Sequence, residues 1–300
     1  MTMAETRTRV EIVEVAPRDG FQVVKEFIPT ARKLEVIDAL AATGIARLEI
    51  GAFVAPNAIP QMADIDEILA KAKIPASVRV QVLVPNAKGA DRAVKAGVKE
   101  LSWVVSVSDT HNKNTVRRSH ADSMREFEAA WPSIKTSGVK LRFNLATCFD
   151  CPFEGRIAEK DVYRALERVL ATASDVEVAI CDTTGRAATN HVADLTAGVV
   201  SAFGSNRITF AFHGHDTYGL GVANAIAAFN SGIDVIDGAA AGLGGCPFAP
   251  GASGNTATED LVFAFEHMGI STGIDLAKLL PAADLAAACA PKDAAGRLRT

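Results

Sequence analysis

The sequence predicts one α/β domain, a parallel (β/α)8 barrel of the TIM type. Eight short runs of β-branched or apolar residues recur along the chain, and longer stretches with helical periodicity lie between them. The length supports the same fold, because 300 residues suit eight βα units, whereas a doubly wound sheet usually has fewer strands. We therefore expect a closed barrel covered by helices.

The predicted strands follow one another without a low-complexity linker. In chain order they are Val10–Val15, Arg47–Ile50, Val78–Val84, Leu101–Val107, Leu141–Ala146, Val176–Ile180, Ile208–Phe212 and Val235–Ala239. Amphipathic stretches that predict covering helices include Thr30–Ala42, Asp91–Ala96, Glu159–Ala171, Val192–Ala202 and Leu220–Ser231. We expect residues 1–281 to form the catalytic barrel and residues 282–300 to form a C-terminal tail, either a flexible lid or a frayed end.

Composition and charge favour small-molecule chemistry. The formal net charge of −4 gives no basic excess for nucleic acid or for a membrane surface. No apolar run is long enough to span a membrane, and residues 1–10 do not resemble a secretory signal. Five cysteines suit reduced thiols better than a disulfide framework, so we expect a cytoplasmic protein.

Unusual polar residues cluster directly after the predicted strands, where barrel enzymes place their functional groups. They are Arg18, Asp19 and Gln22 after the first strand, Glu49 at the second, Asn144 in the fifth, Asp182 after the sixth, His213 and His215 after the seventh, and Cys246 and Asn255 after the eighth. The sequence therefore predicts an active site at the carboxyl end of the barrel.

His213 and His215 are two residues apart, so a continuing strand would direct both imidazoles to the same face. Two histidines that are merely hydrogen-bonded explain an isolated pair equally well. The carboxylate of Asp19 and the amide of Asn255 favour a metal site instead. Such a mixed N/O set suits Mg²⁺ or Mn²⁺ better than tetrahedral Zn²⁺.

Four further residues have both a structural and a catalytic interpretation. Arg18 either closes a strand end as an ion pair or stabilises an enolate oxygen. Glu49 and Asp182 are proton acceptors, orienters of the metal ligands or capping carboxylates, and we rank the orienting role first. A lone cysteine is usually a small core residue, but Cys246 lies among five glycines between Gly242 and Gly254, which favours proton transfer in a closing loop.

Three segments resemble the 3-hydroxy-3-methylglutaryl-CoA (HMG-CoA) lyase branch of a metallolyase family that also contains isopropylmalate, homocitrate and citramalate synthases. They are Val13–Gln22, Phe212–Gly219 and the cysteine loop Ala241–Asn255, and the synthases lack the third. The resemblance implies Asp19, His213, His215 and Asn255 as metal ligands, Arg18 as the enolate stabiliser, Cys246 as a proton donor, and Glu49 and Asp182 as supporting carboxylates.

The implied reaction is cleavage of HMG-CoA to acetoacetate and acetyl-CoA, a step of leucine degradation, by a homodimer or higher homo-oligomer. Looser matches suggest substrate or CoA contacts from residues that equally well belong to a charged surface or a pocket wall: Gln22, Lys25, Asn144, Ser108 and Lys113.

The chain departs from the branch at three pocket positions that usually carry a hydroxyl, where it has Ala52, Asn144 and Ala179. Each lost hydrogen bond is worth about 0.5 to 1.5 kcal/mol. The substrate is therefore left open between HMG-CoA and a bulkier or less polar 3-hydroxyacyl-CoA. Two other functions also stay open at this point: a condensing or aldolase-type enzyme that acts on a 2-oxo acid, and an inert barrel.

Overall fold

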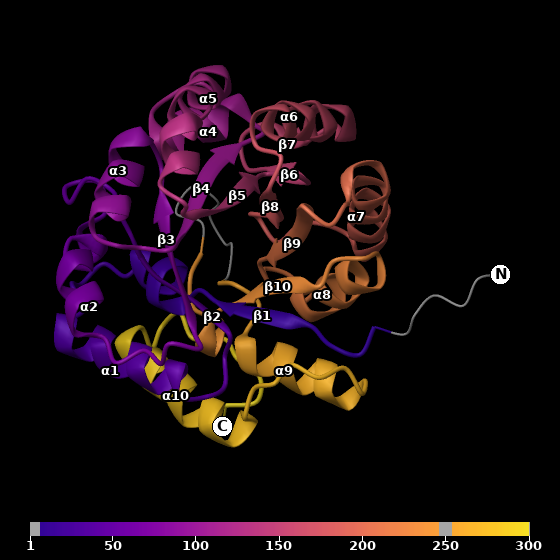
Figure 1. The fold of residues 1–300 in the computed structure, drawn as a ribbon. Coiled ribbons are helices and arrows are strands. Elements are labelled where there is room, and N and C mark those ends of the chain that lie inside the picture. The colour runs from indigo at the N-terminus through magenta and orange to yellow at the C-terminus, as the bar shows by residue number, and fades with distance from the viewer. Residues whose placement is uncertain (1–6, 246–253, 300) are drawn as a thin grey trace.

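Eight parallel strands close into a barrel in the computed structural model, which describes residues 7–245 and 254–299 (Figure 1). The barrel strands are β1 (Glu11–Glu14), β2 (Arg47–Ala52), β3 (Arg79–Val84), β4 (Glu100–Ser106), β5 (Lys140–Ala146), β8 (Val176–Asp182), β9 (Ile208–Gly214) and β10 (Val235–Gly238). They neighbour one another in chain order, and β1 pairs with both β2 and β10. The predicted barrel and the positions of its eight strands are confirmed.

Helices surround the barrel and connect successive strands, as right-handed βαβ crossovers require. The α-helices are α1 (Thr30–Ala41), α2 (Ile65–Lys71), α3 (Ala87–Lys95), α4 (Asp109–Val116), α5 (His120–Thr136), α6 (Glu159–Thr172), α7 (Thr189–Phe203), α8 (Gly221–Asn230), α9 (Thr258–His267) and α10 (Leu276–Cys289). A short hairpin of β6 (Asp150–Cys151) and β7 (Gly155–Arg156) lies between β5 and α6.

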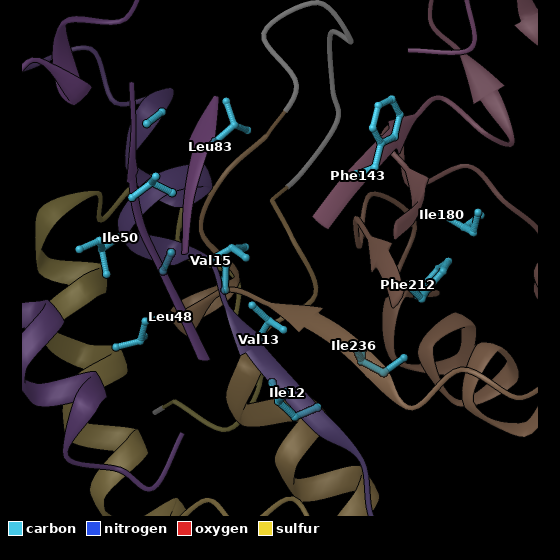
Figure 2. Close-up of a cluster of buried hydrophobic side chains, with 14 of the residues drawn as sticks. Ile12, Val13, Val15, Leu48, Ile50, Leu83, Phe143, Ile180, Phe212 and Ile236 are labelled. Carbon is cyan, nitrogen blue, oxygen red and sulfur yellow. The ribbon is translucent and has the colours of Figure 1, made fainter. Parts of the chain in front are cut away.

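The main hydrophobic core lies between the strands and the helix layer. Alternate strand residues such as Leu48, Phe143, Ile180, Phe212 and Ile236 are buried there (Figure 2). Because side chains alternate across a strand, the residues between them face the inside of the barrel. The β-branched and aromatic residues that predicted the strands are thus the ones that attach them to the helices.

Charged and polar side chains fill much of the barrel interior. Arg47 on β2 contacts Glu177 on β8 at 2.5 Å, and Arg142 on β5 contacts Asp237 on β10 at 2.7 Å. Neither pair of strands is adjacent in the sheet, so these ion pairs cross the interior. Such buried charges are tolerated because each is paired.

The C-terminal residues are packed onto the barrel, which corrects the expected tail. The boundary at residue 281 falls inside α10, which packs against α1 and buries Ala283 and Ala286. Beyond α10, the amides of Ala295 and Gly296 donate to the carbonyl of Ala241 at the start of the loop after β10. Residues 282–299 therefore belong to the folded domain.

Within the described ranges, the structure contains no helix long and apolar enough to cross a membrane.

Candidate active site

A buried turn directly after β1 presents Arg18 and Asp19. It is a π-helix, Ala16–Gly20, with Pro17 in its first turn. The amides of Arg18 and Asp19 both donate to the carbonyl of Val15, at 3.1 and 2.7 Å, which tightens the backbone. π-type turns are rare and often occur at functional sites, because they redirect side chains. Here the turn directs a cation and a carboxylate to the mouth of the barrel.

His213 and His215 lie at the carboxyl end of β9, as the sequence predicted. Their ring centroids are 5.3 Å apart and the rings are tilted by 59°. The Nε2 atom of His215 is 3.8 Å from Oδ2 of Asp19. The two-residue spacing has therefore placed both imidazoles on the side that carries Asp19.

Asn255 reaches the same site because the chain returns there from the loop after β10. The amide of Asp216 donates to Gly254 at 3.0 Å, and the amide of Thr256 donates to Gly214 at 3.0 Å. A side chain at position 254 would collide with the carbonyl oxygen of Gly242, since a Cβ there would lie 1.8 Å from it. Glycine is required at this crossing, and it allows Asn255 to lie beside His215.

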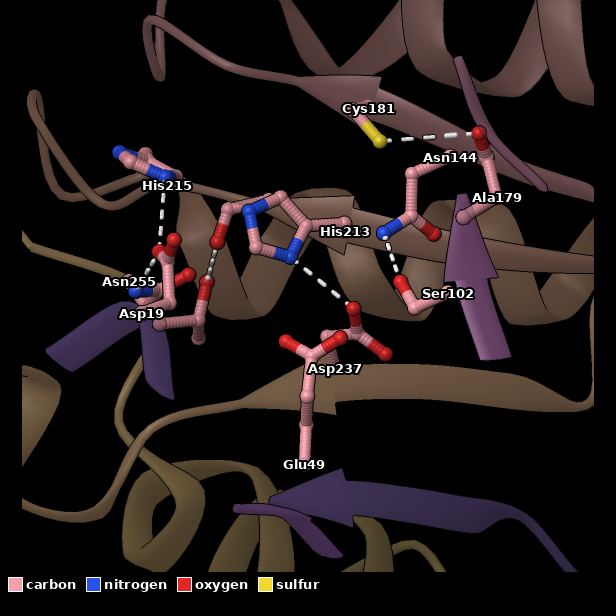
Figure 3. Close-up of polar contacts among 12 residues, drawn as sticks. Asp19, Glu49, Ser102, Asn144, Ala179, Cys181, His213, His215, Asp237 and Asn255 are labelled. Atoms are coloured by element: carbon pink, nitrogen blue, oxygen red, sulfur yellow. Dashed lines mark hydrogen bonds and ion pairs between the residues drawn. The ribbon is translucent and has the colours of Figure 1, made fainter. Parts of the chain in front are cut away.

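These four residues form a group with the chemistry of a divalent-metal site. Ligand atoms of Asp19, His213 and His215 all lie within 4.8 Å of one another. Asn255 donates from Nδ2 to Oδ2 of Asp19 at 2.7 Å, while its buried Oδ1 has no hydrogen-bond partner among the described residues (Figure 3). A buried amide oxygen without a donor is costly and suits a cation. The four residues therefore fit a divalent cation.

Electrostatics keep the carboxylate of this group ionised. Burial alone would raise the pKa of Asp19, but Arg18, His213, His215 and the Asn255 amide more than offset it and lower that pKa to about 2. Gln22, predicted as a substrate contact, donates to Oδ1 of Asp19 at 2.8 Å instead. The carboxylate is therefore available to a metal ion throughout the physiological pH range.

Arg18 is held between two carboxylates. It donates from Nε to Glu49 and from Nη1 to Asp19, and Gln81 donates to the other oxygen of Glu49 at 2.9 Å. Burial lowers the pKa of Arg18, but Asp19 and Glu49 raise this pKa by more than burial lowers it, so the guanidinium stays charged. Glu49 thus orients the guanidinium of Arg18, while its predicted role in orienting the metal ligands stays a prediction.

Asp182, at the end of β8, accepts hydrogen bonds from the turn that follows the strand. Its oxygens accept from the backbone amides of Arg186 and Ala187, at 3.2 and 3.1 Å. Burial raises its pKa to about 6, against the lowering effect of these amides. Of the roles left open for Asp182, its contacts match a carboxylate that caps the turn after β8.

Sequence reasoning missed Asp237 and Arg142. Asp237 lies at the end of β10, where its Oδ2 is 3.0 Å from Nδ1 of His213 and accepts from Arg142 at 2.7 Å. An aspartate inside the predicted strand Val235–Ala239 was the available signal, because a charge in a buried strand needs a partner. The arginine partner is 95 residues away in sequence, so the pair was not apparent.

The residues expected to contact the substrate are spread over different environments. Asn144 lies in the barrel, where Oδ1 accepts from Arg142 at 2.9 Å and Nδ2 donates to Ser102 at 2.7 Å. Ser108 is buried and caps α4 by accepting from the amide of His111. Lys113 is exposed and paired with Asp109 at 2.5 Å, and Lys25 is exposed. Of these predicted contacts, Asn144 lies beside the network that reaches His213, and Gln22 contacts Asp19. Cys246 lies outside the described residues.

Glu14 connects the Arg18 turn to the loop after β10. One carboxylate oxygen accepts from the amides of Ala16 and Ala240, at 2.7 and 3.0 Å, and the other accepts from the Thr258 hydroxyl at 2.7 Å. Burial, only partly opposed by these donors, raises the pKa of Glu14 to about 7. Folding therefore favours the protonated form of this group.

We expect the free energy of unfolding to fall less with rising pH in Glu14→Gln than in wild type. Below pH 4.5, the ordinary pKa of a glutamate, Glu14 is neutral in both the folded protein and the unfolded chain. As the pH rises from 4.5 to 7, Glu14 ionises in the unfolded chain but not in the fold, so the free energy of unfolding falls by about 3 kcal/mol. Glutamine can keep both amide donors and donate to Thr258. Urea unfolding at pH 4.5 and pH 8 measures the difference between the two proteins.

Other groups titrate in both proteins, so the difference between variant and wild type is the quantity to compare. Glu35→Gln, an exposed substitution on α1, is the matched control and should show the wild-type pH dependence. An equal pH dependence in Glu14→Gln and wild type would contradict the expectation.

The chain is similar to known proteins over most of its length. The model of the HMGL-like family matches residues 9–286. The cytoplasmic 3-hydroxy-3-methylglutaryl-CoA lyase of Danio rerio is 38% identical over 275 residues, which are 92% of this chain and 81% of that protein. The mitochondrial hydroxymethylglutaryl-CoA lyase of Homo sapiens is 36% identical over 281 residues, 94% of this chain and 86% of that protein.

Solved structures of the same enzyme class are similar over nearly the whole chain. The structure of an HMG-CoA lyase from Acinetobacter baumannii, in complex with coenzyme A and 3-methylmalate, matches with a TM-score of 0.91 and 37% identity and covers 99% of this chain and 96% of that one. The HMG-CoA lyase from Brucella melitensis matches with a TM-score of 0.88 and 35% identity and covers 93% of this chain and 98% of that one.

Proposed function

This chain belongs to the HMGL-like family and is a carbon–carbon lyase, and on that premise we propose that it cleaves HMG-CoA to acetoacetate and acetyl-CoA with a divalent metal ion. One observation carries the proposal: Asp19, His213 and His215 converge within 4.8 Å at the barrel mouth, with the Arg18 guanidinium bonded to Asp19. The CoA-bound relative supports an acyl-CoA ligand.

The chemistry assigns separate tasks to the residues. Asp19, His213, His215 and Asn255 would hold Mg²⁺ or Mn²⁺, which when bound supplies a Lewis acid that acidifies the tertiary hydroxyl of the substrate. A base takes up the hydroxyl proton, and C3 becomes a ketone carbon as the bond between C2 and C3 breaks. The electron pair of that bond passes to the thioester, which becomes an enolate.

Arg18 is suited to stabilise this enolate. Among the described residues, its contacts engage Nε and Nη1, so the N–H groups of Nη2 are available to a substrate oxygen. Glu49 holds the guanidinium in place, so little reorganisation is needed when the negative charge develops. Cys246 would then donate a proton to C2, which completes acetyl-CoA.

A related 3-hydroxyacyl-CoA is the second candidate substrate, because the side of the site away from Asp19 offers few hydrogen-bond donors. Ala179 carries none, and the Asn144 amide is engaged by Arg142 and Ser102 (Figure 3). Cys181, a weak donor, lies beside them. This surface suits a larger apolar group at C3 better than it suits additional oxygens.

We expect purified protein with Mg²⁺ or Mn²⁺ to convert HMG-CoA into equal amounts of acetoacetate and acetyl-CoA. Mass spectrometry of the products, over a panel of 3-hydroxyacyl-CoA compounds with longer apolar groups at C3, measures kcat/KM for each. If the side of the site with few hydrogen-bond donors sets the substrate preference, kcat/KM for the longer analogue should exceed kcat/KM for HMG-CoA by about 10-fold or more. Burial of one or two methylene groups supplies a difference of this size.

Full-strength turnover of HMG-CoA with no gain for the longer analogues would remove the second candidate. Incubation with acetyl-CoA and 2-oxo acids tests for a condensing enzyme. Formation of a condensation product without cleavage of any 3-hydroxyacyl-CoA would overturn the proposal.

A further inference from the structure

His213 depends on a buried aspartate for its orientation. Asp237 is 4% exposed, and its Oδ2 lies 3.0 Å from Nδ1 of His213. Figure 3 shows the His213 ring between Asp237 on one side and the Asp19, His215 and Asn255 group on the other. A carboxylate can only accept at this contact, so Nδ1 carries the proton and the lone pair of the ring is on Nε2.

Arg142 fixes the position of that aspartate. Its Nη2 donates to the same Oδ2 of Asp237 at 2.7 Å, its Nε donates to Asn144 at 2.9 Å, and its Nη1 lies 3.4 Å from Glu177. The side chain is 1% exposed. Three contacts from three different strands leave the guanidinium little freedom, so the oxygen that accepts from His213 is held in one place.

A single oxygen of Asp237, Oδ2, contacts both Arg142 and His213. Oδ1 of Asp237 is buried and has no hydrogen-bond partner within the described part of the chain. The buried guanidinium of Arg142 forms an ion pair with the same carboxylate at 2.7 Å. The contact between His213 and His215 does not select a tautomer, because it is a contact of rings.

We propose that Asp237, held by Arg142, is a positioning residue that fixes the tautomer and ring orientation of His213 and thereby raises the affinity of the site for a divalent ion. The inference rests on the proposed function only through the role of His213 as a ligand. Partners of this kind usually change metal affinity by about 10- to 100-fold.

Titration of the apoprotein with Mn²⁺, followed by the electron paramagnetic resonance signal of the free ion, tests this without an activity assay. We expect Asp237→Ala to weaken Mn²⁺ binding about 10- to 100-fold. Asp237→Asn should recover part of the loss, because an amide oxygen in place of Oδ2 can still accept from both donors. Glu177→Ala is the matched control: it also removes a buried carboxylate from Arg142 but does not touch His213, so it should bind within about 3-fold of wild type.

A double-mutant cycle separates positioning from general damage to the fold. In a His213→Ala background, Asp237→Ala should cause no further loss of Mn²⁺ affinity, because its effect passes through the histidine. Nitrogen NMR of the histidines should place the proton of His213 on Nδ1 in wild type and lose that preference in Asp237→Ala, which gives a readout even where Mn²⁺ binding is weak.

Three outcomes would overturn the inference: unchanged binding in Asp237→Ala, an equal loss in Glu177→Ala, or a full additional loss in the His213→Ala background. If wild-type protein bound no Mn²⁺ at all, the metal chemistry of the proposed function would fail instead. The two failures are therefore distinguishable.

Discussion

Arg18→Gln is expected to lower kcat for thioester cleavage by about 10²- to 10³-fold, with little change in Mn²⁺ affinity. The substitution removes the guanidinium bonded to Asp19, while the four candidate ligands remain. A preorganised donor to a developing oxyanion contributes about 3 to 4 kcal/mol in a site that excludes water. Steady-state kinetics on the substrate with the highest turnover gives kcat and KM separately.

The control for this experiment addresses the buried charge left on Glu49. Loss of one partner from a buried ion pair destabilises a protein by about 3 to 5 kcal/mol, so thermal unfolding of Arg18→Gln should be recorded first. Glu49→Gln keeps the guanidinium but loosens its hold and should reduce kcat by a smaller factor. A folded Arg18→Gln variant that keeps a tenth or more of the wild-type kcat would exclude the assigned role.

Asp19→Asn is expected to weaken Mn²⁺ binding by about 100-fold or more and to abolish turnover at ordinary metal concentrations. Asp19 is the only carboxylate of the candidate metal group, and two histidines with amide ligands bind a hard cation poorly. The pKa of Asp19, lowered to about 2, is below any pH at which the protein would be assayed. Between pH 5 and 8, protonation of Asp19 should therefore not limit metal binding.

Glu177→Gln is the matched control, since Glu177 is also an ion-paired carboxylate of the barrel interior. It pairs with Arg47 and Arg142 and not with a candidate ligand, so its loss should leave Mn²⁺ affinity unchanged within about 3-fold. Calorimetric titration compares the two variants directly. Wild-type affinity in Asp19→Asn, or an equal loss in Glu177→Gln, would contradict the assigned ligand.

The barrel was predictable because its strands carry a local signal. Runs such as Val78–Val84 and Val176–Ile180 alternate residues that attach to the helices with residues that face the interior. Several covering helices were not predicted individually. The Ala-rich stretch that became the second half of α10 was interpreted as a tail because its apolar face is recognisable only against α1.

The sequence by itself determined the fold class and predicted which residues meet at the barrel rim. His213 lies at the end of a strand, Asp19, His215 and Asn255 follow strands, and parallel strands bring their carboxyl ends to one rim. The tertiary structure decided which neighbouring side chains contact and orient these four residues. Arg142 meets Asp237 across the barrel, and Asp182 turns to its own loop, because these contacts depend on the curvature and register of non-adjacent strands. Local sequence patterns do not predict contacts between strands that are not adjacent in the barrel.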